Sequence, residues 1–465
     1  MVPSELCQDE NTIRGPLRRL SKSGPMRYPA YIENAPPLPP FVHAKRRYPD
    51  DHIRDVGASV DRELNRMLAH GVIRKGQQVA VGVGSRGIDR LAEMVSVLCG
   101  GLRRHGALPF IVPAMGSHGG AIAEGQTAVL ERLGITEAAC GAPVVSDMAV
   151  ADLGTVLDEV PLPYGRDFMR ADHAICINRI KPHSKFKAAA ESGLLKMLCV
   201  GMGKHAGALA FHRWALRHGW YKLLKAMGGA IAARSNFRFG LAVVENESDR
   251  VVHIEAVPAS SLLERETALM TMAKARFPRL PFQQLDVLVV GRIGKEISGA
   301  GMDPNVTGRA FDLGESDFST QMRATRVAVL DLTAKTAGNA IGLGNADIIT
   351  ERVFEKLDYE ATLMNALTSL SLHKAFIPVR LPNDEKAIQA CFTTIGPVPL
   401  ERVRAVIVRD TRDVFEFWAS AALAPELEAM EDVSIDPPQP LGFSPDGRLI
   451  DPSLNQYPPH SPEND

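Results

Sequence analysis

The chain has 465 residues, of which 45% are hydrophobic and 6% aromatic, and its net charge is −1. Because single cores rarely exceed about 200 residues, at least two domains are expected. The balanced charge and the scarcity of aromatic residues argue against a nucleic-acid partner. No apolar run reaches the roughly 18 residues of a membrane-spanning helix, and the N-terminus lacks the apolar stretch of a secretory signal. We therefore expect no membrane partner and a cytoplasmic location.

The six cysteines are scattered through the sequence and include no C-x-x-C pair. That spacing disfavours a zinc ribbon or an iron–sulfur cluster. Isolated cysteines in a chain of this length are typical of buried thiols in a reducing compartment.

The chain begins with a segment, residues 1–50, that is rich in proline and arginine and includes ENAPPLPP at 33–40. We expect an irregular arm that wraps the surface or contacts a second copy in a homo-oligomer. Downstream, buried apolar runs alternate with amphipathic stretches that end at glycine, which predicts an α/β domain at 51–278. Strands are expected at 78–83, 108–115, 173–180 and 239–246, and helices at 88–106 and 121–135.

This alternation predicts a Rossmann-like parallel sheet with helices on both faces. A linker follows near 278–284, and the alternation resumes in a smaller C-terminal α/β domain at 284–431, so the fold class is α/β with two α/β domains. The remainder, residues 432–465, is a Pro-rich tail that we expect to be loose. In the second domain, strands are expected at 285–291, 327–333 and 403–410, and a helix at 345–358.

Two strand–helix junctions carry the same short motif, GSRG at 84–87 and GSHG at 116–119. The carboxyl ends of parallel strands form the ligand crevice of an open α/β sheet. Glycine lets the backbone approach a ligand there, and the next helix offers unpaired N–H groups to a phosphate or carboxylate. Arg86 and His118 are therefore predicted at one rim of a site. The alternative is a purely structural role, because these motifs also suit turns and helix caps.

The first junction also fits G-x-G-x-x-G at 82–87, a fingerprint of dinucleotide binding. It keeps an NAD-dependent 2-hydroxyacid dehydrogenase open as an alternative. The fingerprint requires an acidic residue near the end of the next strand to hold a ribose hydroxyl. Here that place is occupied by IVPAMGSHG at 111–119, which contains no acid.

Residues 179–212, RIKPHSKFKAAAESGLLKMLCVGMGKHAGALAFH, gather three histidines, five lysines and one arginine around a single acid, Glu191. The predicted strand leads into KPH, so His183 should lie at another carboxyl end. Lys196 stands in a small-residue context where a bulky ligand could approach, and a lysine there can lose its proton and act as a nucleophile. The other lysines, Lys185, Lys187 and Lys204, are expected to be solvated.

These segments resemble the lactate racemase family, whose members use a nickel-pincer nucleotide. The resemblance covers roughly residues 50–410 and is most specific at 114–212. AMGSHGGAIAEGQ at 114–126 is similar to the family's G-[ST]-H segment, and KPH is similar to its second catalytic histidine step. The resemblance therefore implies that His118 and His183 are catalytic acid/base residues.

Three further positions of the resemblance concern the cofactor and the substrate. SGLLK at 192–196 resembles the family's G-G-x-K, whose lysine is bonded covalently to the cofactor, which implies this role for Lys196. GMGKHAGALAFH at 201–212 resembles a segment whose last histidine ligates nickel, which implies that His212 binds the cofactor and its metal. Arg86 stands where the family has a substrate-binding arginine.

The sequence also departs from the family. Val83 replaces an aspartate and Leu194 a glycine, and AFH at 210–212 replaces the usual N-H. In the second domain the match is confined to Asp303 and Asn305, and the family's substrate-contacting glutamine and lysine have no clear counterpart. Arg309 could supply the missing charge.

The resemblance implies an isomerase, a racemase or epimerase that acts on 2-hydroxy acids. The C2 hydride passes to the cofactor, which leaves a planar 2-keto acid, and returns to the opposite face; the protein supplies a base for each enantiomer and a cation for the carboxylate. Cofactor-maturation proteins would be partners. The alternatives are a nickel-free relative that binds a small acid without racemising it, and the dehydrogenase.

Overall fold

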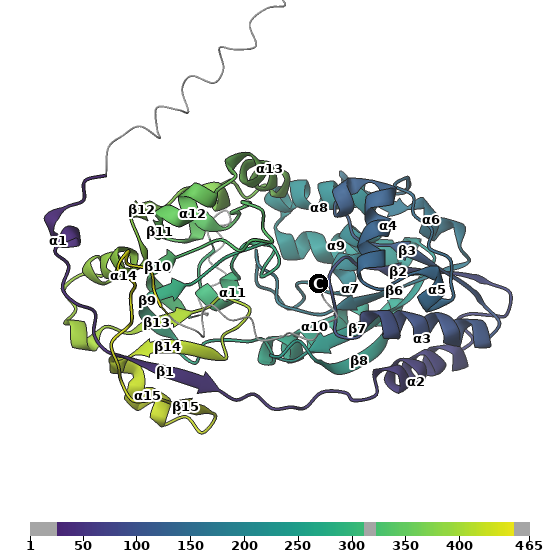
Figure 1. Ribbon diagram of the computed structural model, residues 1–465. Helices are drawn as coiled ribbons and strands as arrows, with labels where there is room; N and C mark the ends of the chain where they lie inside the picture. The colour runs from purple at the N-terminus through teal and green to yellow at the C-terminus, as the bar shows by residue number, and fades with distance from the viewer. Residues whose placement is uncertain (1–25, 311–321, 451–465) are drawn as a thin grey trace, which may run out of the picture.

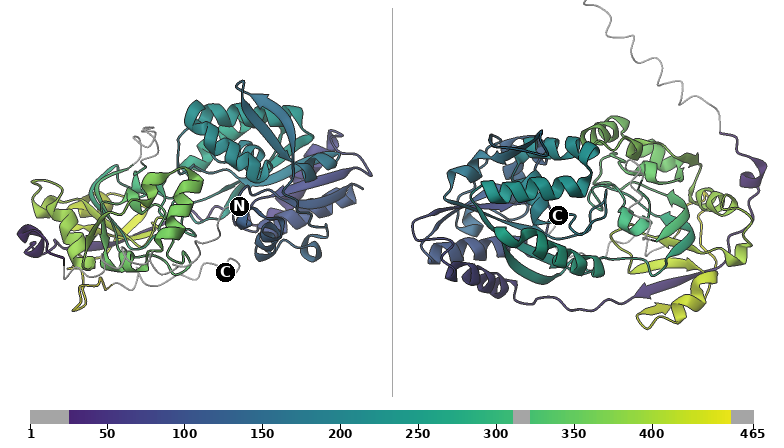
Figure 2. Two further views of the ribbon diagram at one scale, coloured as in Figure 1. Left: turned by 90° about the horizontal axis from the view of Figure 1, so that it is seen from above. Right: turned by 180° about the vertical axis from the view of Figure 1, so that it is seen from behind.

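The computed structural model describes residues 26–310 and 322–450 of the chain. Figure 1 shows two lobes, each built on one main sheet with helices packed against it, and the views in Figure 2 show the same division. The fold class expected from the sequence, α/β with two α/β units, is confirmed.

The sheet of the N-terminal lobe has five strands in the order β3-β2-β6-β7-β8. The first four are parallel, and β8 runs antiparallel to β7. A separate two-stranded sheet, β4-β5, was not predicted. The strands are β2 (Gln78–Val83), β3 (Leu108–Pro113), β4 (Val150–Val156), β5 (Val160–Gly165), β6 (His173–Arg179), β7 (Phe237–Glu245) and β8 (Val251–Pro258).

Helices cover both faces of this sheet because alternate strand residues point to opposite sides. In β2, Val79 and Val81 join the core of α2 and α3, whereas Ala80 joins the core of α8 and α9. One face carries α2 (Val56–Ala69), α3 (Leu91–Arg104), α4 (Ala123–Arg132) and α5 (Glu137–Cys140). The other carries α6 (Arg166–Arg170), α7 (Leu194–Lys196), α8 (Lys204–His218), α9 (Trp220–Arg234) and α10 (Leu262–Ala275).

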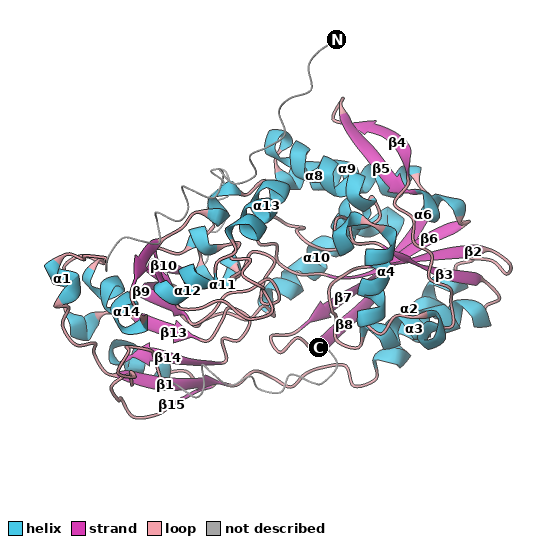
Figure 3. Ribbon diagram, turned by 45° about the horizontal axis from the view of Figure 1, so that its top comes forward, coloured by secondary structure: helices cyan, strands magenta, loops and turns pink. Residues whose placement is uncertain are grey.

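The sheet of the C-terminal lobe has eight strands in the order β12-β11-β10-β9-β13-β14-β1-β15. The first five are parallel, and the last three alternate in direction; Figure 3 shows the flanking helices. The strands are β1 (Phe41–Arg46), β9 (Gln284–Val290), β10 (Arg323–Val329), β11 (Ile348–Thr350), β12 (Val379–Leu381), β13 (Ala405–Val408), β14 (Glu416–Ser420) and β15 (Val433–Ile435). The helices are α1 (Ala30–Glu33), α11 (Pro304–Thr307), α12 (Glu351–Lys356), α13 (Tyr359–Ser369), α14 (Asp384–Thr393) and α15 (Ala424–Glu428).

The two ends of the chain differ from the expectation of an irregular arm and a loose tail. The described part of residues 1–50 contains β1, which pairs with β14 and β15. The described part of the tail, residues 432–465, contributes β15 and buries Leu449, whose backbone N–H donates to Asp384 at 3.0 Å. These pairings join opposite ends of the chain, so no local pattern records them. Residues 1–25 and 451–465 lie outside the described residues.

The helix expected at 345–358 is divided in the structure. Ile348–Thr350 is the buried strand β11, and α12 begins only at Glu351. The Thr350 hydroxyl accepts the N–H of Val353 at 3.3 Å and caps that helix. A strand of this length is too short to show the two-residue alternation of apolar and polar residues. Its apolar residues therefore look like part of the helical pattern that follows.

In the described residues, no single helix is long and apolar enough to cross a membrane; Leu194–Gly201 and Lys204–His218 pass that test only as a pair bent by 110°. The five described cysteines are free and buried, as expected, and Cys7 lies outside the described residues.

We predict that Phe41→Ala destabilises the C-terminal lobe. The Phe41 ring is fully buried on β1 and packs 6.4 Å from the ring of Phe392, so its removal should cost about 3–5 kcal/mol. Urea unfolding measures this. Lys45→Ala, at an exposed position on the same strand, is the matched control and should cost less than about 1 kcal/mol. Equal midpoints for the two variants would contradict the place of β1 in the sheet.

Candidate functional site

The candidate site lies at the carboxyl ends of the strands of the N-terminal sheet. The loop after β2 leads to α3 on one face, and the loop after β6 leads to α7 on the other. Open α/β sheets bind ligands where consecutive loops diverge in this way. The loop after β3 lies beside them, because β3 is the neighbour of β2.

The two GSxG loops contact each other. The Ser85 hydroxyl of the first forms a hydrogen bond with Nδ1 of His118 in the second. Gly116 has a φ of +60°, and a Cβ there would lie 3.1 Å from Val200 Cγ1, so this turn needs glycine. The buried amide of Gln126 donates to the carbonyl of Gly116 at 2.9 Å and to that of His118 at 3.3 Å. These contacts fix the backbone that carries His118.

The loop that carries His183 is folded around the carboxylate of Glu191. That carboxylate is fully buried and accepts the backbone N–H groups of His183 at 2.6 Å and Ala188 at 3.0 Å. It also pairs with the ammonium groups of Lys274 at 2.6 Å and Lys187 at 3.5 Å. A buried carboxylate is stable only with such partners. The single acid of the basic segment therefore shapes the loop.

The imidazole of His183 has a hydrogen-bond partner on each nitrogen. Its Nδ1 accepts the backbone N–H of Lys185 at 3.1 Å, so in the neutral ring the proton is on Nε2. Nε2 lies 2.8 Å from Nζ of Lys196. An Nε2–H group can donate to Nζ only if the amine is neutral. The geometry thus assigns an uncharged Lys196 beside an uncharged His183.

The pKa of Lys196 agrees with this assignment. Burial lowers it to about 7, and the positive charges of Lys181, Arg86 and Lys185 act in the same direction. Near neutral pH, much of the amine is therefore unprotonated and nucleophilic.

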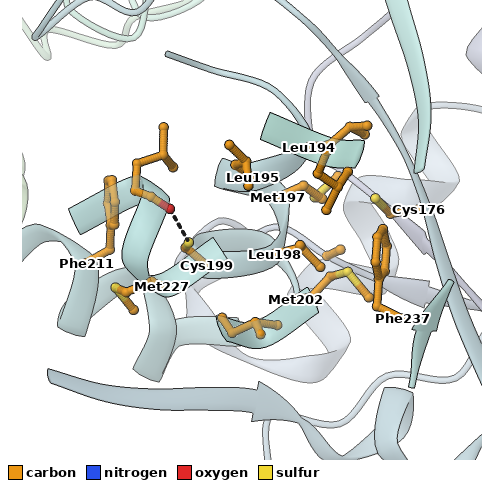
Figure 4. Packing of buried hydrophobic residues seen from close by; sticks show 14 of the residues in the cluster. Cys176, Leu194, Leu195, Met197, Leu198, Cys199, Met202, Phe211, Met227 and Phe237 are labelled. Atoms are coloured by element: carbon orange, nitrogen blue, oxygen red, sulfur yellow. Dashed lines mark hydrogen bonds between the residues drawn. The ribbon is translucent and has the colours of Figure 1, made fainter. Parts of the chain in front are cut away.

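The helical segment that carries Lys196 is anchored by buried neighbours. The carboxyl group of Glu266 accepts the backbone N–H of Leu195 at 2.8 Å, and burial raises the pKa of this carboxyl to about 7. Figure 4 shows the apolar packing of this segment, with Leu194, Leu195, Met197 and Leu198 close to Cys176, Phe211, Met227 and Phe237. Lys196 is thus a polar exception on a segment held in the core.

His212 lies on α8, and its ring contacts Trp220 edge-on with centroids 5.7 Å apart. Its Nδ1 is buried and has no hydrogen-bond partner in the part of the chain that the structure describes. Burial, and to a smaller extent the charges of Lys185 and Lys196, lower the pKa of this imidazole to about 3. A neutral imidazole with a free nitrogen is available as a ligand.

Three cationic side chains at the site lack an acidic partner within ion-pair distance. In the described residues, neither the Arg86 guanidinium nor the Lys181 ammonium forms a hydrogen bond or ion pair, and Lys295 donates only to the Gly299 carbonyl at 3.3 Å. Burial and Arg179 lower the pKa of Lys181 to about 8. Burial and Arg86 lower the pKa of Lys295 to about 8 as well. Cations that lack an ion-pair partner in this way predict an anionic ligand.

Lys295 comes from the C-terminal lobe and was not predicted. It follows β9, and it reaches the same place as Arg86: a Cβ built on Gly299 would lie 3.2 Å from Arg86 Nη2. Arg309, which was expected to supply a charge here, instead binds the carbonyl of Thr325 at 2.7 Å and the carboxylate of Asp347 at 2.9 Å. That expectation was wrong because the side chain turns back onto its own lobe.

Asp303 and Asn305, the two residues of the second domain that resemble the family, lie next to the loop that carries His183. The Asn305 amide donates to Asp303 at 2.8 Å and to the carbonyl of His183 at 3.4 Å, and its oxygen accepts from Lys187. The loop of His183 is therefore held by both lobes.

The expectation that Lys185, Lys187 and Lys204 are solvated was wrong. Lys185 is 9% exposed and donates to the carbonyl of Ser369 at 2.6 Å, across the lobes. Lys187 pairs with Glu191, and Lys204 is fully buried and donates to the carbonyl of Pro113 at 3.0 Å. Backbone carbonyls and one buried acid provide partners that a sequence pattern does not reveal.

The site residues that were predicted from the sequence shift one another's pKa values electrostatically. Although His118 keeps solvent exposure, the surrounding protein and the charges of Arg86, Lys295 and Lys196 together lower its pKa to about 4. Burial, Lys196 and His212 hold the pKa of His183 well below its ordinary range. The contacts agree: Ser85, next to Arg86, is hydrogen-bonded to His118; His183 is hydrogen-bonded to Lys196; and the rings of His183 and His212 both lie close to that of Trp220. The structure therefore brings all five residues to one site, while their individual roles stay predictions.

The described residues include no group of three or more histidine, cysteine or carboxylate side chains that could hold a metal ion.

No protein-family model matches this chain, and no curated protein is significantly similar to it in sequence. Among solved structures, it is similar to the lactate racemase apoprotein from Thermoanaerobacterium thermosaccharolyticum, with a TM-score of 0.45 and 12% identity. The match covers 74% of this chain and 98% of that one. A likeness of this degree says nothing about what this chain binds or catalyses.

We predict that Glu191→Gln lowers the free energy of unfolding by about 3 kcal/mol, because the fully buried carboxylate that accepts two backbone N–H groups and pairs with Lys274 is lost. Chemical denaturation measures the change. Glu264→Gln, at an exposed position on α10, is the matched control and should change stability by less than about 0.5 kcal/mol. If both variants unfold together with wild type, Glu191 does not organise the loop.

We also predict a pH-dependent difference between wild type and Lys196→Met. With a pKa near 7 in the folded chain and an ordinary value of 10.5, the unfolded chain binds the extra proton between these limits. The free energy of unfolding of wild type therefore rises relative to that of the variant as pH rises from 7 to 10.5. The pKa shift favours Lys196→Met over wild type most below pH 7, and this contribution disappears near pH 10.5. Urea unfolding across this range measures it, and a pH-independent difference would contradict the shift.

Proposed function

We propose that this chain is a 2-hydroxyacid racemase or epimerase of the lactate racemase type. One observation carries the proposal: a neutral lysine amine lies against a neutral histidine, beside cations without acidic partners and near a second histidine. Inversion at C2 of a hydroxy acid by hydride transfer requires an acceptor for the hydroxyl proton of each enantiomer and an anchor for the carboxylate. His118 and His183 are the proton acceptors, and Arg86 and Lys295 anchor the carboxylate.

The residues present fit a nickel-pincer nucleotide. Lys196 offers a neutral amine for a covalent bond, and His212 offers an imidazole nitrogen that is buried without a hydrogen bond. Lys181, the unpaired cation that the substrate carboxylate does not need, suits the phosphate of a nucleotide. When bound, this group supplies a reversible acceptor for the C2 hydride.

The protein residues then handle the proton and the charge. Arg86 and Lys295 bind the carboxylate of the substrate from the two lobes, which fixes C2. One histidine takes the hydroxyl proton of one enantiomer, and the other gives a proton to the same oxygen once the centre has inverted. In the reverse direction the two histidines exchange these roles. A bound anion offsets the cations that depress the pKa of His118, so its pKa rises toward its ordinary value and the imidazole becomes a better base.

The proposal is tested with protein produced together with cofactor-maturation proteins, which it requires as partners. Nickel content, intact mass and racemisation of a panel of 2-hydroxy acids are measured. His118→Asn and His183→Asn should each lower kcat by about 100-fold to 10,000-fold with nickel retained. His205→Asn, at an exposed position on α8, is the control and should leave the rate unchanged.

The cofactor roles have separate readouts. Lys196→Ala should lose the added covalent mass, and His212→Ala should lose nickel. A wild-type protein that carries no added mass and no nickel, yet binds 2-hydroxy acids, would overturn the racemase and leave the nickel-free binding protein. A nicotinamide absorbance change with these acids would favour the dehydrogenase.

A further inference from the structure

We propose that, without any metal cofactor, Lys196 forms a Schiff base with 2-oxo acids bound by Arg86 and Lys295, which gives the apoprotein a carbonyl-binding activity of its own. This goes beyond the racemase, because it requires neither nickel nor a hydride acceptor. The amine itself is the reacting group.

The first support is the state of the amine. Lys185 donates its backbone N–H to Nδ1 of His183, which leaves the ring proton on Nε2, and Nε2 lies 2.8 Å from the Lys196 amine. No carboxylate of the described residues lies within ion-pair distance of Lys196 to hold it as an ammonium. The amine therefore keeps its lone pair for attack on a carbonyl carbon.

The second support is the charge around the amine. Arg86 and Lys181 have no hydrogen bond or ion pair in the described residues, and the Lys295 ammonium contacts only the carbonyl of Gly299. A cationic iminium formed from a neutral ketone would add another positive charge to this group. A 2-oxo acid brings a carboxylate with its carbonyl, so the new charge is balanced within the ligand.

The third support is the position of Arg86 and Lys295, whose nitrogens both approach Gly299 from opposite lobes. A carboxylate can be held there by two cations at once. The loop that carries Arg86 lies against the segment that carries Lys196, because a Cβ built on Gly84 would lie 3.3 Å from Met197 Cε. A carboxylate and an adjacent carbonyl on one ligand match that arrangement.

The reaction balances without an oxidant or a reductant. The Nζ–C2 bond forms, and the C2–O bond breaks. The oxygen leaves as water with one proton from the amine and one from solvent, and the iminium keeps the second amine proton. His118 and His183 lie at the site to transfer these protons.

The test uses the full chain expressed without cofactor-maturation proteins and freed of metal by a chelator. It is incubated with pyruvate and sodium cyanoborohydride at pH 8, and the reduced adduct is located by intact mass and peptide mapping. We expect one adduct, on Lys196. Pyruvamide, which has the same ketone but no carboxylate, should give at least about 10-fold less, a difference equal to one modest ionic contact.

Variants separate the parts of the proposal. Lys196→Arg, which keeps the charge, should abolish the adduct, and Arg86→Gln should lower the yield with pyruvate but not with pyruvamide. Lys222→Arg, at an exposed position on α9, should leave the adduct unchanged. Folding of each variant is checked by circular dichroism.

The outcomes are distinct from those for the racemase. Equal labelling of several lysines, equal yields with pyruvate and pyruvamide, or an unlabelled wild type would each overturn the Schiff-base proposal. None of these results bears on nickel content or racemisation in the loaded protein, because the trapping is done without the cofactor.

Discussion

The Glu191 carboxylate holds the loop between β6 and α7 in place. It accepts two backbone N–H groups and pairs with Lys274, so the loop closes around a charge that has left water. This closure sets the backbone of His183 and Lys185, and with it the hydrogen bond that fixes the proton of the imidazole on Nε2. That proton faces the Lys196 amine, which burial and the neighbouring cations keep largely unprotonated. One buried acid thereby positions the histidine that contacts the nucleophile of the same segment.

An excess of cations is the second constraint on the site. A folded chain normally pairs buried charges, because an isolated one loses its hydration without compensation. Here the pKa values of Lys181, Lys196 and Lys295 are lowered instead, so part of the cost is avoided by giving up protons. An arrangement of this kind is stable enough to fold and is relieved when an anion binds. The same property supports both the racemase and the carbonyl-binding activity.

The division of the molecule into two lobes determines where these charges meet. Arg86, His118 and His183 follow parallel strands of one sheet, whereas Lys295 and Asn305 come from the other lobe. Contacts across the lobes, such as Lys185 to the carbonyl of Ser369, bring the two sets of loops together. A ligand held by both Arg86 and Lys295 would join the lobes, which links binding to their relative position.

The sequence by itself determined the α/β class, the strands β2, β6, β9 and β13, and the loops that carry Arg86, His118 and His183. It could do so because a buried strand and its glycine turn are local patterns, and parallel strands place their following loops at one edge. Only the tertiary structure decided the place of β1 and β15 in the sheet, the partners of the buried lysines and the position of Lys295 beside Arg86. These depend on contacts between distant parts of the chain. The protonation of Lys196 likewise depends on burial and on Lys181, Arg86 and Lys185, whose charges act through space rather than along the sequence.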